Sequence, residues 1–334
     1  MLAAFMLLAL VSPPSSIGLP GGQPIGMDYV ACDRAHHRVW VPAGNTGNVD
    51  VVDTPTGKVT AIGGFPTRPS GRPGRPPMGP SSVAVAGGVI WVGNRGDDRV
   101  CAFDAVTLAR KTCVALRAMP DGIAWVGATR ELWVTTPRLH ALAVVGADGG
   151  VATIPVDGSP EGFAVDDAAG RFYTNLKDKN RTLVFDVRSR RLVATWPSHC
   201  SQEGPRGLAI DPARHLLFVA CTSGALELDT VTGQPIGAPE GGRASLHACG
   251  WVGTGTGVDN LEYLREGGLL YVANGRDGGG LTVARVRDDD YRCLDVLGST
   301  VTAPGARNPA VDANGTAYLP DPEEGKLLVI PPSW

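Results

Sequence analysis

The feature that most constrains the fold is a short strand-like segment with an aromatic residue in it, which recurs seven times along the chain. Residues 131–134 read ELWV, and comparable apolar segments surround six other aromatic residues. The seven aromatic residues are Trp40, Trp91, Trp133, Tyr173, Phe218, Tyr271 and Tyr318. Their separations of 40 to 53 residues match the length of one blade of a β-propeller. The sequence therefore predicts seven repeated units.

Each unit carries the signals of four strands. A Pro-x-Gly motif followed by apolar, small and apolar residues precedes the aromatic segment, as in PDGIAWV at residues 120–126. A third strand follows, and its Asp-x-x-Thr turn at residues 53–56 is typical of a hairpin. The last unit has no room for a fourth strand before Trp334, but SSIGLPGG at residues 15–22 has the pattern of one. We predict an all-β, seven-bladed propeller with four antiparallel strands per blade, closed into a ring by this N-terminal strand.

Composition supports this fold and limits the classes of partner. The 334 residues include 45 Gly and 27 Pro, which suits short strands joined by tight turns. Residues 15–334 are predicted to form a single propeller domain. A net charge of −3 offers no basic surface for nucleic acid, so we expect no nucleic-acid partner. No phosphate-binding loop, nucleophile elbow or helical metal motif is present in the sequence.

Residues 1–14 are predicted to be a separate N-terminal segment. Its apolar run from Leu2 to Val11 is too short to span a bilayer as a helix, so we expect no transmembrane span. It has the apolar core of a secretory signal but lacks the basic residues that begin one. The alternative interpretation is a buried edge segment of the fold. We expect an exported protein, periplasmic or secreted and monomeric, with a cytoplasmic location left open.

Seven cysteines and no CxxC motif argue against a zinc cluster. Cys101 and Cys113 flank a short turn and are predicted to face each other across a hairpin, and Cys200 and Cys221 are a second candidate disulfide. Such pairs fit an oxidising compartment, whereas the alternative is small buried thiols. The odd count leaves at least one thiol free or paired elsewhere. A soft-metal group is a further interpretation, which a Cys200–Cys249 disulfide would exclude; its members would be His199, Cys200, His247 and Cys249.

The repeats resemble a known propeller family. FYTNLKDKNRTLVFDVRSRRLV at residues 172–193 and GTGVDNLEYLREGGLLYVANGRDGGGLTV at residues 255–283 resemble bacterial YVTN-repeat propellers, and the similarity covers nearly the whole chain. That resemblance implies an exported binding or interaction scaffold. A weaker resemblance, to gluconolactonase and regucalcin propellers, depends on PDGIAWVGATRELWV at residues 120–134. It implies a calcium-dependent enzyme whose metal ligands include an acidic residue of this segment.

The candidate site lies where the loops that enter the innermost strands gather, at one mouth of the central channel. The variable residue of the Pro-x-Gly motif is expected there in every blade: Ile25, Ser81, Asp121, Glu161, Arg206, Asp259 and Arg307. Asp28 and Glu262 replace an alanine of the other repeats, and a buried charge should be paired or bound to metal. The predicted ligand-binding residues are Asp28, Asp121, Glu161, Arg206, Asp259, Glu262 and Arg307.

The same mouth is a candidate site for a divalent cation. Carboxylate and amide oxygens suit a hard cation such as calcium, and the predicted ligands are Asp121, Glu161, Asp259 and Asn175. Asn175 comes from a second-strand exit, where asparagine also serves turns for backbone reasons. The alternative to a functional site is a structural ion-pair network that seals the channel.

These residues support two hypotheses about function. The first is an exported binding or interaction propeller, with a small-molecule or protein ligand at the channel mouth. The second is a metal-dependent enzyme of lactonase or lyase type, in which the cation polarises a carbonyl or activates water. An insertion at residues 65–78, with Arg68, Arg72 and Arg75, is either a solvated loop or a basic lid that attracts anionic ligands.

Overall fold

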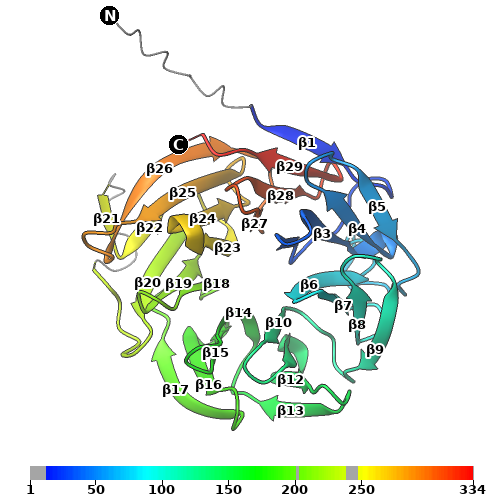
Figure 1. Ribbon diagram of the computed structural model, residues 1–334, viewed down its shortest axis with the longest axis horizontal. Helices are drawn as coiled ribbons and strands as arrows, with labels where there is room; N and C mark the ends of the chain where they lie inside the picture. The colour runs from blue at the N-terminus through cyan, green and yellow to red at the C-terminus, as the bar shows by residue number, and fades with distance from the viewer. Residues whose placement is uncertain (1–12, 201–202, 238–246, 334) are drawn as a thin grey trace, which may run out of the picture.

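The strands form seven sheets arranged around a central axis, as the predicted propeller requires (Figure 1). The structure is a computed structural model that describes residues 13–200, 203–237 and 247–333. Helical structure in these residues is limited to three short 3-10 turns, η1 (Gly44–Thr46), η2 (Pro137–Leu139) and η3 (Arg265–Gly267). None of the described helices is long and apolar enough to cross a membrane. The predicted N-terminal segment, apart from residues 13 and 14, lies outside the described residues.

The first four blades follow the chain from the channel outward. Blade 1 contains β2 (Ala31–Asp33), β3 (Arg38–Ala43), β4 (Asn48–Asp53) and β5 (Val59–Ile62). Blade 2 contains β6 (Pro80–Ala86), β7 (Val89–Asn94), β8 (Arg99–Asp104) and β9 (Arg110–Ala115). Blade 3 contains β10 (Ile123–Val126), β11 (Glu131–Thr136), β12 (Ala141–Val145) and β13 (Val151–Pro155). Blade 4 contains β14 (Pro160–Asp166), β15 (Arg171–Leu176), β16 (Arg181–Asp186) and β17 (Arg191–Pro197).

The last three blades include the exceptions to this order. Blade 5 contains β18 (Leu208–Asp211), β19 (Leu216–Cys221), β20 (Gly224–Asp229) and β22 (Trp251–Gly253). Blade 6 contains β23 (Val258–Leu264), β24 (Leu269–Asn274), β25 (Gly280–Val286) and β26 (Cys293–Val301), with β21 (His247–Cys249) as a fifth, outer strand. Blade 7 contains β27 (Ala310–Val311), β28 (Ala317–Asp321), β29 (Lys326–Ile330) and β1 (Ser15–Gly18).

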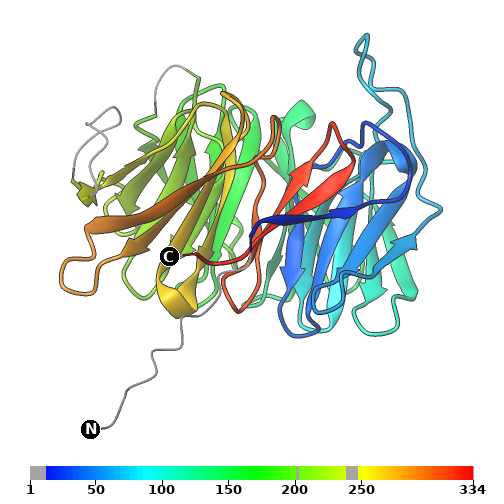
Figure 2. The ribbon, with the colours of Figure 1, turned by 90° about the horizontal axis from the view of Figure 1, so that it is seen from above.

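The N-terminal strand closes the ring, which confirms the prediction. β1 pairs antiparallel with β29, so that Ser15 lies opposite Val329 and Gly18 opposite Lys326. The two ends of the chain therefore share one sheet, where the blue and red strands lie side by side (Figure 1). The view from above shows the blades edge-on, with the loop between β5 and β6 projecting beyond its neighbours (Figure 2).

The hydrophobic core lies between the blades. The described residues form seven apolar clusters, each with members from two neighbouring blades. Trp133 of blade 3, for example, has no exposed surface and packs on Phe172 of blade 4, with their ring centroids 4.8 Å apart. Six of the seven repeated aromatic residues are buried, and Trp91 is partly exposed. Burial of one such side chain contributes about 2 kcal/mol or more, so the repeated aromatics set the spacing of the sheets.

The glycine of the Pro-x-Gly motif has a packing role. A Cβ atom on Gly162 would lie 2.2 Å from the carbonyl oxygen of Arg206 and 2.4 Å from Cα of Gly207, in the next blade. Neighbouring innermost strands approach this closely because the blades converge towards the central axis. A side chain at this position would force the two blades apart.

The structure contains three disulfides. Cys101–Cys113 and Cys200–Cys221 are formed, as predicted, and Cys249–Cys293 joins β21 to β26. Cys32 is the one free cysteine. The soft-metal interpretation is wrong because the sulfurs of Cys200 and Cys249 are both consumed in disulfides.

Blade 1 contains a buried acid that no sequence signal marked. Asp50 is fully buried in β4, and neither carboxylate oxygen has a hydrogen-bond partner. Burial raises the pKa of Asp50 to about 7. Blades 4, 5 and 7 carry Leu183, Leu226 and Leu328 at the equivalent place in their third strands, so an apolar side chain fits this position.

We expect Asp50→Leu to stabilise the protein above neutral pH. The folded state holds the Asp50 proton more tightly than the unfolded chain, so wild-type stability falls as pH rises from about 4 to 7. At pH 8 the ionised carboxylate costs on the order of 4 kcal/mol, and Asp50→Leu removes this cost. Urea unfolding at pH 5 and pH 8 should show a gain that is larger at pH 8. Asp157→Asn, at an exposed carboxylate, is the control, and an equal gain at both pH values would contradict the prediction.

Candidate functional site

The register of the innermost strands fixes which residues meet at the channel mouth. Ala124 lies opposite Trp133 in blade 3, and Ala31 lies opposite Trp40 in blade 1. Asp28, three residues before Ala31, is therefore the equivalent of Asp121. The residues at this position around the ring are Asp28, Ser81, Asp121, Glu161, Arg206, Asp259 and Arg307.

This register corrects the prediction for blade 1. Ile25 is not at the mouth, because it is fully buried in the apolar cluster between blades 7 and 1. The sequence Pro24-Ile25-Gly26 has the form of the repeated motif but lies in the loop before the strand. Asp28 is likewise not a substitute for the alanine, a place that Ala31 fills.

The mouth is built from charges of both signs. We define the charged ring as Asp28, Asp121, Glu161, Arg206, Asp259 and Arg307, together with Arg95 and Lys177. Arg95 donates to Asp28 at 2.8 Å and also to Asp121. Lys177 donates to Glu161 at 3.1 Å, and Arg307 pairs with Asp259 at 3.0 Å. The four carboxylates and four cations compensate one another.

Arg206, on blade 5, connects the ion pair of Glu161 to the ion pair of Asp259. Its guanidinium lies 3.7 Å from Glu161 and 3.8 Å from Asp259. The pairs thus run from Lys177 through Glu161, Arg206 and Asp259 to Arg307. This geometry has the form of the structural ion-pair network that was the alternative to a functional site. The side chains of the charged ring nevertheless remain partly exposed to solvent.

Burial and neighbouring charges shift the protonation of the ring. Burial is the main cause that raises the pKa of Asp121 to about 7, opposed by Arg95 and reinforced by Asp28 and Glu161. Burial likewise raises the pKa of Glu161, against the opposing effect of Lys177. The carboxylate of Asp259 raises the pKa of Arg307. Asp121 therefore has a pKa near neutral pH.

The predicted cation ligands have protein partners. Asn175 is fully buried, donates to the carbonyl oxygen of Arg206 at 2.8 Å and accepts from Thr182 at 2.7 Å. Its amide therefore connects blades 4 and 5, a structural role different from the turn that the sequence suggested. Among residues 13–200, 203–237 and 247–333, no group of three His, Cys, Asp or Glu side chains is arranged to hold a metal ion. Calcium binding by Asp121, Glu161 and Asp259 stays a prediction.

Two aromatic rings lie one step deeper than the charged ring. Tyr29 follows Asp28, and Phe163 lies two residues after Glu161, on blades 1 and 4. Their rings stack across the channel with centroids 6.0 Å apart. Burial, followed by the charges of Asp121 and Asp28, raises the pKa of Tyr29 well above its ordinary value. This pair narrows the channel between the charged ring and the space beyond.

Glu262 does not belong to the charged ring. It lies opposite Tyr271, three residues farther along its strand than Asp259. Its partner is Arg34, at 2.8 Å, from the turn after β2. The structure therefore brings together six of the seven predicted ligand-binding residues and separates Glu262 from them.

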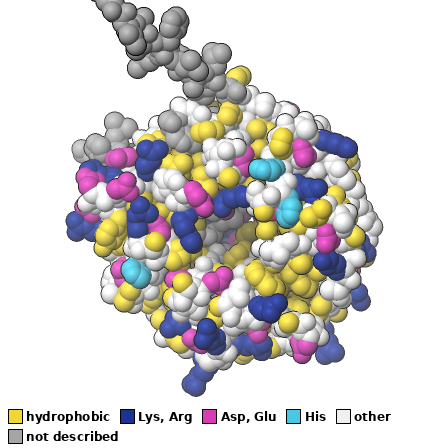
Figure 3. All heavy atoms as spheres, viewed as in Figure 1, with side chains coloured by type: hydrophobic (Ala, Val, Ile, Leu, Met, Phe, Trp, Pro, Cys, Tyr) yellow, Lys and Arg dark blue, Asp and Glu magenta, His cyan; other side chains and the backbone are white. Residues whose placement is uncertain are grey.

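Figure 3 shows one face of the ring, hollowed at its centre, with acidic and basic side chains around the hollow.

Sequence reasoning missed Arg95, Lys177 and Tyr29. Arg95 and Lys177 directly follow the second strands β7 and β15, whose exits face the same mouth as the innermost-strand entries. The sequence signal that could have identified them was a charged residue at these strand exits.

The basic insertion at residues 65–78 is anchored by Arg68, which pairs with both oxygens of Asp98 at 2.7 and 3.1 Å. Arg72 and Arg75 of the same insertion are exposed.

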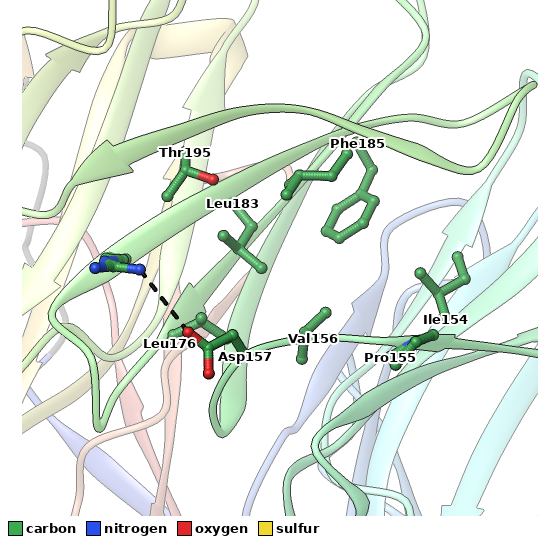
Figure 4. Close-up of a pocket in the computed structure, with 10 residues that line it drawn as sticks. Ile154, Pro155, Val156, Asp157, Leu176, Leu183, Phe185 and Thr195 are labelled. Carbon is green, nitrogen blue, oxygen red and sulfur yellow. Dashed lines mark ion pairs between the residues drawn. The ribbon is translucent and has the colours of Figure 1, made fainter.

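A second concave region lies on the outside of the ring, between blades 3 and 4. Its volume is about 370 Å³, and apolar side chains such as Ile154, Leu183 and Phe185 line it (Figure 4). Asp157 and Arg181 lie at its edge, 4.0 Å apart. It contains no arrangement of acid, base and nucleophile among the residues that line it.

Comparison with known proteins supports the fold. No protein-family model and no curated protein matches the sequence. The chain is similar to a chain in the crystal structure of the mitotic checkpoint complex, with 15% identity, a TM-score of 0.74 and coverage of 99% of both chains. A streptogramin B lyase gives 12% identity, a TM-score of 0.71 and coverage of 95% of this chain and 96% of that chain. Virginiamycin B lyase from Staphylococcus aureus gives 12% identity, a TM-score of 0.70 and coverage of 96% and 99%. At these identities the similarity shows the seven-bladed propeller, and the likeness to YVTN-repeat propellers remains a resemblance.

We expect Arg95→Met to destabilise the protein by about 3 kcal/mol at pH 7. The substitution leaves Asp28 and Asp121 without their shared cation, and the side chains of these acids are only 22% and 15% exposed. Lys177→Met, at a cation 37% exposed, should cost less than about 1 kcal/mol. Urea unfolding of both variants measures the difference. Equal losses would show that Arg95 does not hold the two acids together.

Proposed function

We propose that this chain is an exported binding protein whose ligand occupies the charged ring at the channel mouth. The observation that carries the proposal is that the negative and positive charges of the ring neutralise one another. Because each of the four carboxylates lies within 4 Å of a cationic side chain, the ring is a preformed polar surface. Such a surface suits recognition, whereas metal-assisted chemistry needs carboxylates free to bind the cation.

The exposure of the ring indicates the class of ligand. Arg307 and Lys177 are its most open members, with side chains 49% and 37% exposed, and its carboxylates are 15% to 22% exposed. A ligand that approaches from solvent meets these two cations first. We therefore expect a ligand with acidic groups, either a small molecule or a segment of a protein.

The disulfides support the export part of the proposal. Three disulfides in a chain of this size are typical of secreted or periplasmic proteins, because cytosolic thiols are kept reduced. The neighbour from the mitotic checkpoint complex illustrates that this fold occurs in protein assemblies.

Charge reversal at the ring should abolish ligand capture. The wild-type protein, the double variant Lys177→Glu/Arg307→Glu and the control Arg188→Glu are each immobilised and exposed to the extracytoplasmic fraction of the source cells. Arg188 is exposed on a turn of the opposite face, so its change leaves the ring intact. We expect the wild type and the control to retain the same acidic component and the double variant to lose it. Retention of that component by the double variant would contradict a site at the ring.

A second candidate is a metal-assisted enzyme of lactonase or lyase type at the same mouth. The pKa of Asp121, near 7, suits a group that moves a proton at neutral pH, and two neighbours in fold are lyases. Fold similarity alone does not transfer their activity.

Metal analysis separates the two candidates. For the binding protein we expect no stoichiometric cation and an equal melting temperature before and after chelation with EDTA. A stoichiometric cation, together with a melting temperature lowered by EDTA and by Glu161→Gln, would favour the enzyme and contradict our proposal. Arg188→Glu again serves as the control, since it leaves all the carboxylates in place.

A further inference from the structure

The central channel contains a cavity beyond the Tyr29–Phe163 pair. Its volume is about 380 Å³, within the range of sites for small ligands. Innermost strands of all seven blades contribute to its wall, whose side chains are mostly apolar and include Val85, Trp125, Phe163 and Ile210. These four side chains are partly exposed, so the cavity is accessible to solvent.

One charged residue interrupts the apolar wall. At the position opposite the repeated aromatic residue, six blades carry alanine: Ala31, Ala84, Ala124, Ala164, Ala209 and Ala310. Blade 6 carries Glu262 at this position, and Glu262 lines the cavity. A single carboxylate therefore lies in a layer of methyl groups.

Among the described residues, only one oxygen of the Glu262 carboxylate has a protein partner. Arg34 donates from Nη2 to Oε1 of Glu262 at 2.8 Å and from Nε to the carbonyl oxygen of Val311 at 2.9 Å. Oε2 of Glu262 has no hydrogen bond to any residue of the described chain, and the side chain is 36% exposed. This oxygen is an acceptor available to a ligand in the cavity.

The charges near this end of the cavity favour a cation. Besides burial, four charged side chains lie near enough to the thiol of Cys32 to shift its pKa. They are the carboxylates of Asp33, Asp312 and Glu262, which raise it, and the guanidinium of Arg34, which lowers it. Cys32 also lines the cavity. Asp33 pairs with His36 at 2.7 Å, so Asp312 and Glu262 are the carboxylates that outnumber the guanidinium of Arg34. Aromatic rings in the wall can add attraction for an organic cation.

The shape of the wall distinguishes an organic cation from a metal ion. A hard metal ion needs several oxygen ligands, and no such group converges in the part of the chain that the structure describes. An ammonium group with an apolar body needs one or two acceptors and an apolar surface, and the cavity offers both.

We propose that the central cavity binds a small primary ammonium ion with an apolar body. Its N–H groups donate to Oε2 of Glu262, and its body packs against the apolar wall near Trp125 and Phe163. This site is separate from the charged ring and does not depend on the ligand proposed there.

The test uses 2-phenylethylammonium chloride as the probe and calorimetric titration as the readout. We expect the wild type to bind it, to bind neutral 2-phenylethanol more weakly and not to bind 3-phenylpropionate. Glu262→Gln should weaken binding of the ammonium ion about tenfold or more, because it removes the charged acceptor. Glu266→Gln, at an exposed residue of the same blade, is the control and should bind as the wild type does.

Two further measurements keep the proposal falsifiable if Glu262→Gln alters the fold. Ala209→Leu fills the cavity without a change of charge and should abolish binding. The probe should also slow alkylation of Cys32 by N-ethylmaleimide, since this thiol is the one free cysteine and lines the cavity. Equal binding of the ammonium and carboxylate probes, unchanged affinity in Ala209→Leu, or unprotected Cys32 would each overturn the proposal. Lys177→Glu/Arg307→Glu should bind the probe normally, which separates this result from the outcome at the charged ring.

Discussion

Packing between neighbouring sheets is the interaction on which the rest of the structure depends. A single blade of four strands has two faces and cannot cover either by itself, so each must be buried against a neighbour. The contact of Trp133 with Phe172 belongs to one of seven apolar clusters, one at each interface between blades. Because the last blade must also meet the first, the arrangement is complete only when β1 joins β29. The position of every loop at the mouth follows from this closed geometry.

Closure brings like charges together and so creates the need for the charged ring. Equivalent positions of neighbouring blades converge on the axis, and four of them carry carboxylates. Partly buried carboxylates at short range repel one another unless cations lie between them. Arg95, Arg206, Lys177 and Arg307 supply those cations. In the proposed function Lys177 and Arg307 would also contact the ligand, so stability and recognition would share side chains at this mouth.

The sequence predicted the fold better than the site because the two depend on different information. The spacing of the aromatic residues determines blade number, and the motif at residues 120–126 determines strand order. The prediction for blade 1 placed Ile25 at the mouth because Pro24-Ile25-Gly26 matches the Pro-x-Gly motif. These residues lie in the loop before the strand, and the burial of Ile25 is evident only in the packed structure. Arg95 was missed because its role depends on which acids face it from blades 1 and 3. The Cys249–Cys293 bond joins residues 44 apart through a strand of three residues, too short for a pattern to indicate.

The placement of β1 has a consequence for the order of synthesis. This strand is the first of the described strands to be made, and its partner, Lys326–Ile330, is the last. The seventh sheet can therefore be completed only after Lys326–Ile330 has been synthesised, and until then the ring stays open. If the chain is exported unfolded, as we propose, this delay keeps it competent for passage, and the fold forms where the three disulfides can be made.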